Sequence, residues 1–362
     1  MSQAIGTSGG VKRKNVAGPL GDKRRLHSKQ LGQVDRAFGT EPVVGFDLPN
    51  GSTSISNRRI SDIAEGPPYF YLACALQGVR DESQFLHGIE PEFVDSKYFC
   101  AVAGKRSYVH NLPTFGRFHI DPIQPRTIHE VFPQTRKWWP PWDTRTQLNC
   151  IRTTTAPATV FKNVRLELTK CHNHPNEVGR KKILDGCREW NLIWVGLKKV
   201  AALEPGEVET VLGLPKDHTR GFSMTDRYRA LGNSVQVDTI AFHLSVLEAM
   251  FPSGIRVLSL FSGIGGAEVA LDRLGIQLKV VVSAEFSKMN QNILRTWWEQ
   301  SKQTGELIPI DDVQRLKGDY LETLVRRFGG FDLIVCGSLE QPSQFHYCSH
   351  ILEQVKQFMR RM

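Results

Sequence analysis

The sequence lacks a long apolar run and lacks cysteine pairs at redox or metal-binding spacing. No stretch is apolar enough over a sufficient length to span a bilayer, so we expect no contact with a membrane. The 7 cysteines are odd in number and none belongs to a CxxC pair, which indicates free thiols in a reducing compartment. Cys171-His-Asn-His174 has no matching second ligand pair, so we interpret it as a surface loop and expect no metal.

Large apolar side chains are also scarce in residues 1–65, which are rich in Gly, Ser, Asn, Lys and Arg. This composition predicts a disordered tail. Its two basic triplets, Lys12-Arg13-Lys14 and Lys23-Arg24-Arg25, fit either a bipartite nuclear import signal or a solvated basic tail. The DNA-related features described below favour the nucleus.

The bulk of the chain has the composition of a folded protein. Its 362 residues allow two domains, or one large domain with a tail, and 40% of them are hydrophobic. The formal net charge of +9 fits an anionic partner such as nucleic acid, although solubility alone also accounts for a modest positive excess.

The most informative stretch is Val257–Glu285. An apolar run predicts a buried parallel strand, a glycine-rich turn leads into a helical pattern, and a second apolar run ends at an acid. This is the pattern of a βαβ nucleotide-binding unit: glycines let the backbone approach a ligand, and the acid can bind ribose hydroxyls. The turn alone is weak evidence, because a structural strand–helix turn has the same glycines.

Two other stretches carry polar groups at expected element ends. Asp226–Val237 (DRYRALGNSVQV) precedes an amphipathic helix predicted over Asp238–Met250, and the βαβ unit follows directly. Phe331–Cys336 reads as a buried strand that ends at Gly337-Ser-Leu-Glu340.

Basic and aromatic residues alternate in Thr135–Asn149 (TRKWWPPWDTRTQLN). Such a mixture suits a surface that follows phosphates and stacks bases, or else a tryptophan-rich packing corner with solvated charges. We expect the tryptophans to be core residues and the basic residues to contact DNA. The predicted DNA contacts are Arg117, Arg136, Lys137 and Arg145.

Several of these motifs resemble DNA cytosine-5 methyltransferases. FSGIGG is similar to the first conserved motif of those enzymes, and RYRALGNSVQV to the last. Here the last motif precedes the first, which is typical of the plant domains-rearranged methyltransferases. GPPYFY, PEFVDSKYFCA, TRKWWPPWD and DHTRG also resemble that family, so the similarity extends from about Gly66 to the C-terminus.

The resemblance implies a circularly permuted, Rossmann-like α/β fold with an inserted target-recognition region. The expected organisation is a tail (1–65) followed by a methyltransferase-like domain (66–362), which divides into 66–237, a connecting helix (238–254) and a cofactor half (255–362). S-adenosylmethionine (SAM) is the implied cofactor. Its implied contacts are Phe261, Ser262, Gly263, Ile264, Gly265 and Gly266 with the methionine part, Glu285 with the ribose, Asp312 and Val313 with the adenine, and Asn233, Ser234 and Val235 closing the pocket.

The same resemblance predicts that the catalytic groups are missing. The family places Pro-Cys after Gly-Ser, where this chain has Leu339-Glu340, and Glu-Asn-Val where it has Ala73-Cys74-Ala75. A cysteine thiolate adds to C6 of a flipped cytosine while the glutamate protonates N3, so both groups are needed. The loop that normally closes over the base is shortened to Gln341–Gln344. Rescue by Cys336 or Cys74 would require a new geometry.

We therefore expect a non-catalytic homologue that supports RNA-directed DNA methylation and gene silencing in the nucleus. The implied partners are DNA and an active family member in a heterodimer, or other silencing machinery. The alternative is an active SAM-dependent DNA cytosine-5 methyltransferase. The intact glycine motif fits either retained SAM binding or a purely structural role. Family members carry ubiquitin-associated domains ahead of the catalytic region, and none is recognisable here.

Overall fold

A computed structural model describes residues 66–74, 89, 91–170, 175–339 and 341–362, all within one compact unit, Gly45–Met362. The expected tail, the Cys171–His174 motif, Ala75 and Glu340 fall outside these residues. In the described part of the chain, no helix has the length and apolar character needed to cross a membrane.

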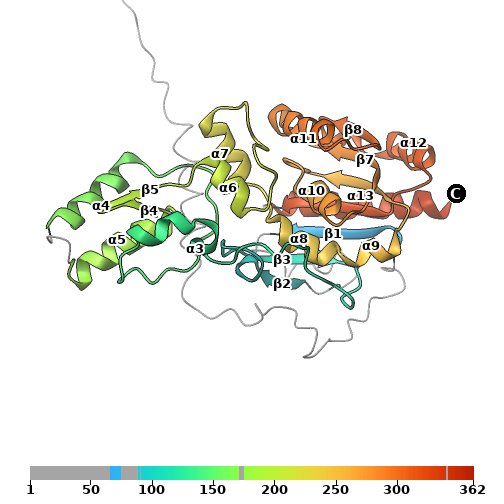
Figure 1. Cartoon of the computed structure of the whole chain (residues 1–362). Helices are drawn as coiled ribbons and strands as arrows, with labels where there is room; N and C mark the ends of the chain where they lie inside the picture. Colours follow the sequence, from blue (N-terminus) through green and yellow to red (C-terminus); the bar gives the residue numbers. More distant parts are fainter. Residues whose placement is uncertain (1–65, 75–88, 90, 171–174, 340) are drawn as a thin grey trace, which may run out of the picture. The chain divides into compact units, whose positions relative to one another are not determined.

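The main feature is a seven-stranded sheet with the order β2-β3-β1-β9-β6-β7-β8 (Figure 1). The strands are β1 (Tyr69–Cys74), β2 (Glu92–Asp95), β3 (Lys105–His110), β6 (Ile255–Leu260), β7 (Leu278–Ala284), β8 (Glu306–Ile310) and β9 (Leu333–Leu339). In the spatial order β1-β9-β6-β7-β8, every strand is parallel to its neighbours. Strand β3 runs antiparallel to both β1 and β2. The predicted mixed α/β class with a mostly parallel sheet is confirmed.

Helices cover both faces of this sheet, which explains why its central strands are apolar along their whole length. Val257 and Leu333 point to the face packed by α8 (Val237–Leu244), α10 (Gly266–Arg273) and α11 (Lys288–Gln300). Their neighbours Leu258 and Ile334 point to the opposite face, packed by α12 (Gly318–Phe328) and α13 (Pro342–Arg360). Successive strand residues alternate between the two layers.

A smaller unit with its own core is formed by α4 (Ala158–Lys170), α5 (Glu177–Glu189), β4 (Ile193–Gly196) and β5 (Lys199–Ala201). Trp194 and Ile183 are buried at its centre, and the Trp194 Nε1 donates to Asp143 Oδ2 at 2.7 Å. Helices α4 and α5 are amphipathic, and most of their polar residues lie on their outer faces.

The remaining elements lie in the segments that connect the strands and helices described above. They are the helices α3 (Ile128–Val131), α6 (Pro205–Val211), α7 (Met224–Gly232) and α9 (Val246–Met250), and the 3-10 turns η3 (Ser96–Tyr98), η4 (Pro133–Trp138) and η5 (Val313–Arg315).

Tertiary contacts shape three local segments. Within Pro91–Ala103, strand β2 pairs with β3 and is followed by one 3-10 turn. Gly232 is the last residue of α7, where a Cβ atom would lie 2.5 Å from the Arg152 carbonyl carbon. The single helix expected over Asp238–Met250 is divided at Ser245, whose hydroxyl accepts the Phe118 N–H at 3.0 Å.

Candidate cofactor and catalytic site

The cofactor turn, Phe261–Gly266, connects β6 to α10 at the carboxyl edge of the sheet. Its backbone has positive φ at Phe261 (52°), Gly263 (57°) and Gly265 (86°). Glycine adopts this region freely, whereas a phenylalanine there is strained. The Ser262 and Ser283 hydroxyls hydrogen-bond at 2.6 Å and so tie the turn to β7. Strain held in place by packing is common at ligand sites.

The three glycines of the turn have different surroundings. A Cβ on Gly265 would lie 2.5 Å from Leu294 Cδ1, and one on Gly266 would lie 2.5 Å from Val235 Cγ2. At Gly263 a Cβ would meet nothing within 4 Å. Two glycines are therefore required by the packing of the protein itself. Only Gly263 leaves open space that a ligand could fill.

Glu285 follows β7 and faces this turn. Its Oε2 accepts the Gly263 N–H at 2.9 Å, and its Oε1 accepts the Ser287 N–H at 2.8 Å. Its own N–H donates to the Ile310 carbonyl at 2.9 Å, which joins the ends of β7 and β8. Oε1 also accepts from the Asn290 amide at 3.3 Å. A carboxylate oxygen has two acceptor sites, so the second site of Oε2 is open to a ribose hydroxyl.

The predicted adenine residues lie at the end of the neighbouring strand. Asp312 caps the 3-10 turn η5 by accepting the Gln314 N–H at 2.8 Å, and Val313 follows it. The Tyr347 hydroxyl of α13 donates to the Val313 carbonyl at 2.6 Å and so holds this loop. The parallel strands β6, β7 and β8 therefore bring the glycine-rich turn, Glu285 and the Asp312-Val313 pair to the same edge of the sheet.

Phe286 is an exposed aromatic residue that the sequence interpretation missed. It follows Glu285 directly, and 86% of its surface is exposed. Single exposed apolar side chains are common on protein surfaces, so it is the position of this ring beside Glu285 that makes it a candidate ligand contact. In the sequence, the one indication that Phe286 could contact a ligand was its position directly after Glu285.

Ser234 and Val235, two of the three residues predicted to close the pocket, lie beside the cofactor turn. Asn233 caps the end of α7, and the buried Val235 packs against Gly266. The Ser234 hydroxyl would be 3.8 Å from a Cβ at Gly266. Segments separated by about thirty residues in the sequence thus form one wall.

His218, from the DHTRG motif, was not assigned a role from the sequence. It is buried, and its Nε2 lies 2.8 Å from the Ile264 carbonyl oxygen of the cofactor turn. Burial lowers its pKa, so a neutral imidazole that donates from Nε2 fits this contact. Buried Glu209 accepts the Thr219 N–H at 2.9 Å and pairs with Arg227 at 3.0 Å, which fixes the loop that carries His218.

The positions expected to be catalytic lie at the ends of β1 and β9. Cys74 pairs with Leu339 across the parallel strands, and Ala73 is 1% exposed in the core. Helix α13 begins at Pro342, only three residues after Leu339. No room remains in the sequence here for a loop that closes over a base.

The nearby thiols face away from this edge into the core. Cys74, Cys336 and Cys348 are all 3% exposed or less and belong to the layer under α13. Burial, and then the neighbouring Cys348 thiol, raise the pKa of Cys336 well above its usual value. A buried neutral thiol is a poor nucleophile, because the thiolate is the reactive form.

The four predicted DNA-contacting residues divide into two pairs. Arg136 and Lys137 are exposed on η4, with the Lys137 Nζ 5.0 Å from the centre of the Trp138 ring. Arg145 is buried: it pairs with Asp143 at 2.8 Å and donates to the Cys187 and Leu192 carbonyls. Its guanidinium group holds the smaller unit to the rest of the chain, which makes it unavailable to a phosphate.

Arg117 is likewise inside the protein, with 3% of its side chain exposed. It donates to both carboxylate oxygens of Glu92, at 2.8 and 3.0 Å, and Glu92 also pairs with His110 at 2.9 Å. Burial opposes the charge on Glu92, but His243, His110 and Arg117 together hold its pKa well below the usual range. A DNA contact by Arg117 would require breaking this pair.

Among residues 66–74, 89, 91–170, 175–339 and 341–362, no group of three or more His, Cys, Asp or Glu side chains is arranged to hold an ion.

Comparison with known proteins agrees with the motifs. The chain is 55% identical to DNA (cytosine-5)-methyltransferase DRM2 of Oryza sativa subsp. japonica over 301 residues, which are 82% of this chain and 50% of that protein. It is 49% identical to DRM2 of Arabidopsis thaliana over 330 residues (87% and 52%). It is 40% identical to the "Probable inactive DNA (cytosine-5)-methyltransferase DRM3" of Oryza sativa subsp. japonica over 323 residues (83% and 47%).

The chain thus spans about half the length of the curated relatives it matches. These relatives include proteins named as methyltransferases and proteins named as inactive. A scan against protein-family models finds no match.

Proposed function

The chain is a homologue of the DRM family of DNA (cytosine-5)-methyltransferases, and we propose that it is a non-catalytic member that keeps the SAM pocket. The observation that carries this proposal is the contrast between two neighbouring groups of strand ends, those of β6 and β7 and those of β1 and β9. The cofactor turn and Glu285 are in place, while the strand end that should present the nucleophile continues directly into α13.

Cytosine C5 is too weak a nucleophile to attack SAM without help. A thiolate must first form a bond to C6, with a proton delivered to N3, and the electrons then reach C5. Leu339 and Ala73 supply neither a thiolate nor an acid. The buried thiols of Cys74 and Cys336 do not replace them, because burial disfavours the thiolate.

The residues present fit SAM as a bound ligand. The open space over Gly263 suits the methionine part, Glu285 suits the ribose hydroxyls, and the exposed Phe286 ring suits the adenine face. Asp312 and Val313 complete the adenine side, and the segment 233–235 closes the opposite wall. When bound, SAM supplies an electrophilic methyl group. The residues of this chain hold and orient it, but no group in the proposed site activates an acceptor.

We also propose that the fold is circularly permuted. Strand β6 carries the cofactor turn and is the strand from which a methyltransferase chain normally starts. Here β1, β2 and β3 precede it in the sequence, yet they extend the same sheet beyond β9. The domain boundaries at residues 66, 238 and 255, and the role of the α4–α5 unit as an inserted recognition region, belong to the same proposal.

The proposed biological role is support of RNA-directed DNA methylation and gene silencing in the nucleus. Because the chain lacks the transfer groups, this role requires an active DRM protein as a partner or another component of the silencing machinery. DNA contact would use exposed basic side chains such as Arg136 and Lys137.

Transfer of labelled methyl from SAM to duplex DNA tests the proposal. We expect the purified chain alone to stay at background, on the order of 10⁴-fold or more below an active DRM2, since loss of a covalent catalyst has effects of this size. Separate calorimetry should detect SAM binding. Methyl incorporation that Cys336→Ala or Cys74→Ala abolishes would overturn the non-catalytic proposal. The co-purification of an active DRM protein with the tagged chain tests the pairing.

An active methyltransferase is the second candidate function. It is favoured by the 55% identity to a protein named DRM2 and by the complete cofactor turn. It requires a nucleophile that the end of β9 does not provide, so the same assay decides between the two.

A further inference from the structure

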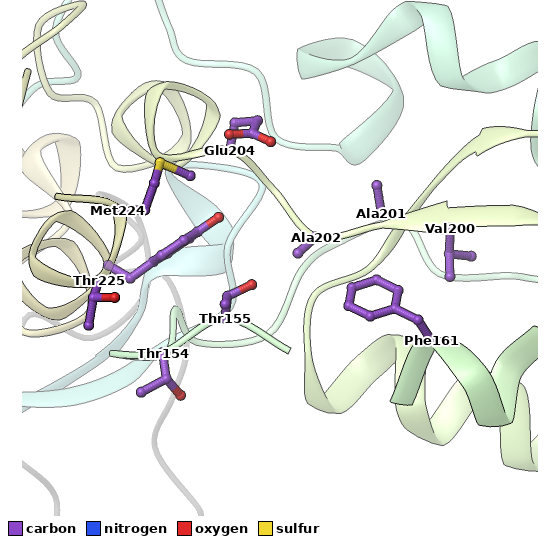
Figure 2. Close-up of a pocket in the computed structure, with 10 residues that line it drawn as sticks. Thr154, Thr155, Phe161, Val200, Ala201, Ala202, Glu204, Met224 and Thr225 are labelled. Atoms are coloured by element: carbon purple, nitrogen blue, oxygen red, sulfur yellow. The ribbon is translucent and has the colours of Figure 1, made fainter. Parts of the chain in front are cut away.

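A pocket of about 460 Å³ lies between the α4–α5 unit and helices α6 and α7 (Figure 2). It is separate from the cofactor turn, and none of its lining residues belongs to the proposed SAM site. Figure 2 shows the Phe161 ring and the Met224 side chain on opposite sides of the pocket, with Glu204 at its edge. A volume of this size is within the range of sites that bind small ligands or single side chains.

Two aromatic rings give the pocket fixed apolar surfaces. Phe161 comes from α4 and is half-buried. Tyr228 comes from α7 and is 8% exposed, with its hydroxyl donating to the Leu203 carbonyl at 2.6 Å. That hydrogen bond fixes the tyrosine ring in place. Met224, 47% exposed, adds an adaptable and polarisable side chain to the same lining.

The charge of the lining is opposite to the net charge of residues 152–200, the segment that carries Thr154, Thr155 and Phe161 of the lining. Residues 152–200 contain ten Lys and Arg against four Asp and Glu, yet none of the ten described lining residues is a Lys or Arg and one is Glu204. Burial, and then the charge of Glu204, raise the pKa of the Tyr228 phenol, so the carboxylate acts on this pocket. The lining therefore favours a cation and disfavours a phosphate-bearing nucleotide.

Aromatic faces with one carboxylate and no cation form the chemistry that recognises alkylated ammonium groups. We propose that this pocket binds the methylated ammonium group of a lysine side chain on a basic polypeptide. The pocket is larger than the ammonium head alone needs, so it also has space for the carbon stem of that lysine. Such a site would attach the chain to a methylated protein independently of SAM and of methyl transfer.

Fluorescence anisotropy with the full chain tests this proposal. The probe is a short labelled basic peptide with one central lysine, prepared unmodified and mono-, di- and trimethylated. We expect the trimethylated peptide to bind about tenfold more tightly than the unmodified one. Phe161→Ala and Glu204→Gln should each remove most of that difference. Equal affinity for all four peptides would refute the proposal.

Matched controls separate recognition from folding. Glu207→Gln alters the other acid of the same capping box at the start of α6, but Glu207 does not line the pocket. Phe115→Ala removes an aromatic ring that is 81% exposed outside the pocket. Both controls should bind the trimethylated peptide as the unchanged chain does. A loss in Glu207→Gln equal to that in Glu204→Gln, or displacement of the peptide by free nucleosides, would contradict a lysine site.

Discussion

The sheet places candidate site residues at two groups of strand ends, those of β6 and β7 and those of β1 and β9. The two groups differ in how many segments of the chain must come together to form a site. At the ends of β6 and β7, a single stretch of twenty-five residues, Phe261–Glu285, supplies both the turn and the acid. At the ends of β1 and β9, a working site would need an acid after β1 and a nucleophile with a closing loop after β9. Under our proposal, local replacements at residues 73 and 339 remove the chemistry and leave the cofactor turn unchanged. The proposal therefore treats donor binding and methyl transfer as separable properties.

Restoring a cysteine after β9 should not restore methyl transfer. We expect Leu339→Pro/Glu340→Cys to remain on the order of 10⁴-fold below an active relative in labelled-methyl transfer. The reason is that β9 still leads into α13 at Pro342, and Ala73 still lacks an acid. The unchanged chain is the control, with circular dichroism to verify folding. Substantial incorporation by this variant would mean that the thiol was the only missing part.

Substitutions at two glycines of the cofactor turn should separate its role in folding stability from its role in SAM binding. Gly265→Ala should lower the free energy of unfolding by about 3 kcal/mol, since the new Cβ would lie 2.5 Å from Leu294 and φ is positive. Gly263→Ala has open space and should cost about 1 kcal/mol, yet weaken SAM binding. Urea unfolding and calorimetry measure the two effects. Unimpaired SAM binding by Gly263→Ala would show that the open space is not the ligand site.

Glu285 tests the ribose side with a smaller effect. Glu285→Gln keeps an oxygen acceptor but loses the charge, so we expect SAM affinity to fall about tenfold. Asp311→Asn is a matched control, because Asp311 is exposed and pairs with Arg315 at 3.0 Å. Calorimetry on both variants gives the comparison. Equal affinities in the two variants would contradict the assignment of the ribose to Glu285.

The smallest effect concerns pH and His218. Burial lowers its pKa in the folded protein, so below the ordinary value near 6.5 the unfolded chain binds a proton that the folded chain does not. Folding stability contributed by neutral His218 is therefore present above pH 7 and decreases as pH falls toward its folded pKa. Urea midpoints at several pH values should show a shallower acid-side slope for His218→Gln. An unchanged slope would mean that His218 is protonated equally in both states.

Much of the cofactor side could be predicted from the sequence because its signal is contiguous. The apolar runs, the glycines and Glu285 all lie within one βαβ pattern, and short-range backbone rules determine that pattern. The residues missed, Phe286 and His218, gave weaker signals. A role for Phe286 could not be inferred from the sequence, because its exposure depends on the fold. A role for His218 of DHTRG could not be inferred either, because its contact with the Ile264 carbonyl is visible only in the structure.

The environment of the basic residues, by contrast, could not be predicted from the sequence. Arg117 and Arg145 look like Arg136 and Lys137 in the sequence, since all four lie near aromatic residues. The structure separates them through contacts between distant segments: Glu92 is brought to Arg117 by strand pairing, and the Cys187 and Leu192 carbonyls accept from Arg145, whose carboxylate partner Asp143 is a near neighbour in the sequence. A buried arginine without its carboxylate would be strongly destabilising, so the partners decide its place.

By itself, the sequence determined the order of the motifs, the presence of the cofactor turn and the replacements at residues 73 and 339. Each of these is a matter of residue identity and spacing. The tertiary structure alone decided that Cys336 is a buried thiol, that two arginines are internal ion-pair partners, and that Phe161, Tyr228 and Glu204 line one pocket. The physical reason is that burial and charge pairing depend on segments far apart in the chain. Only the folded sheet and its packed helices bring these segments into contact.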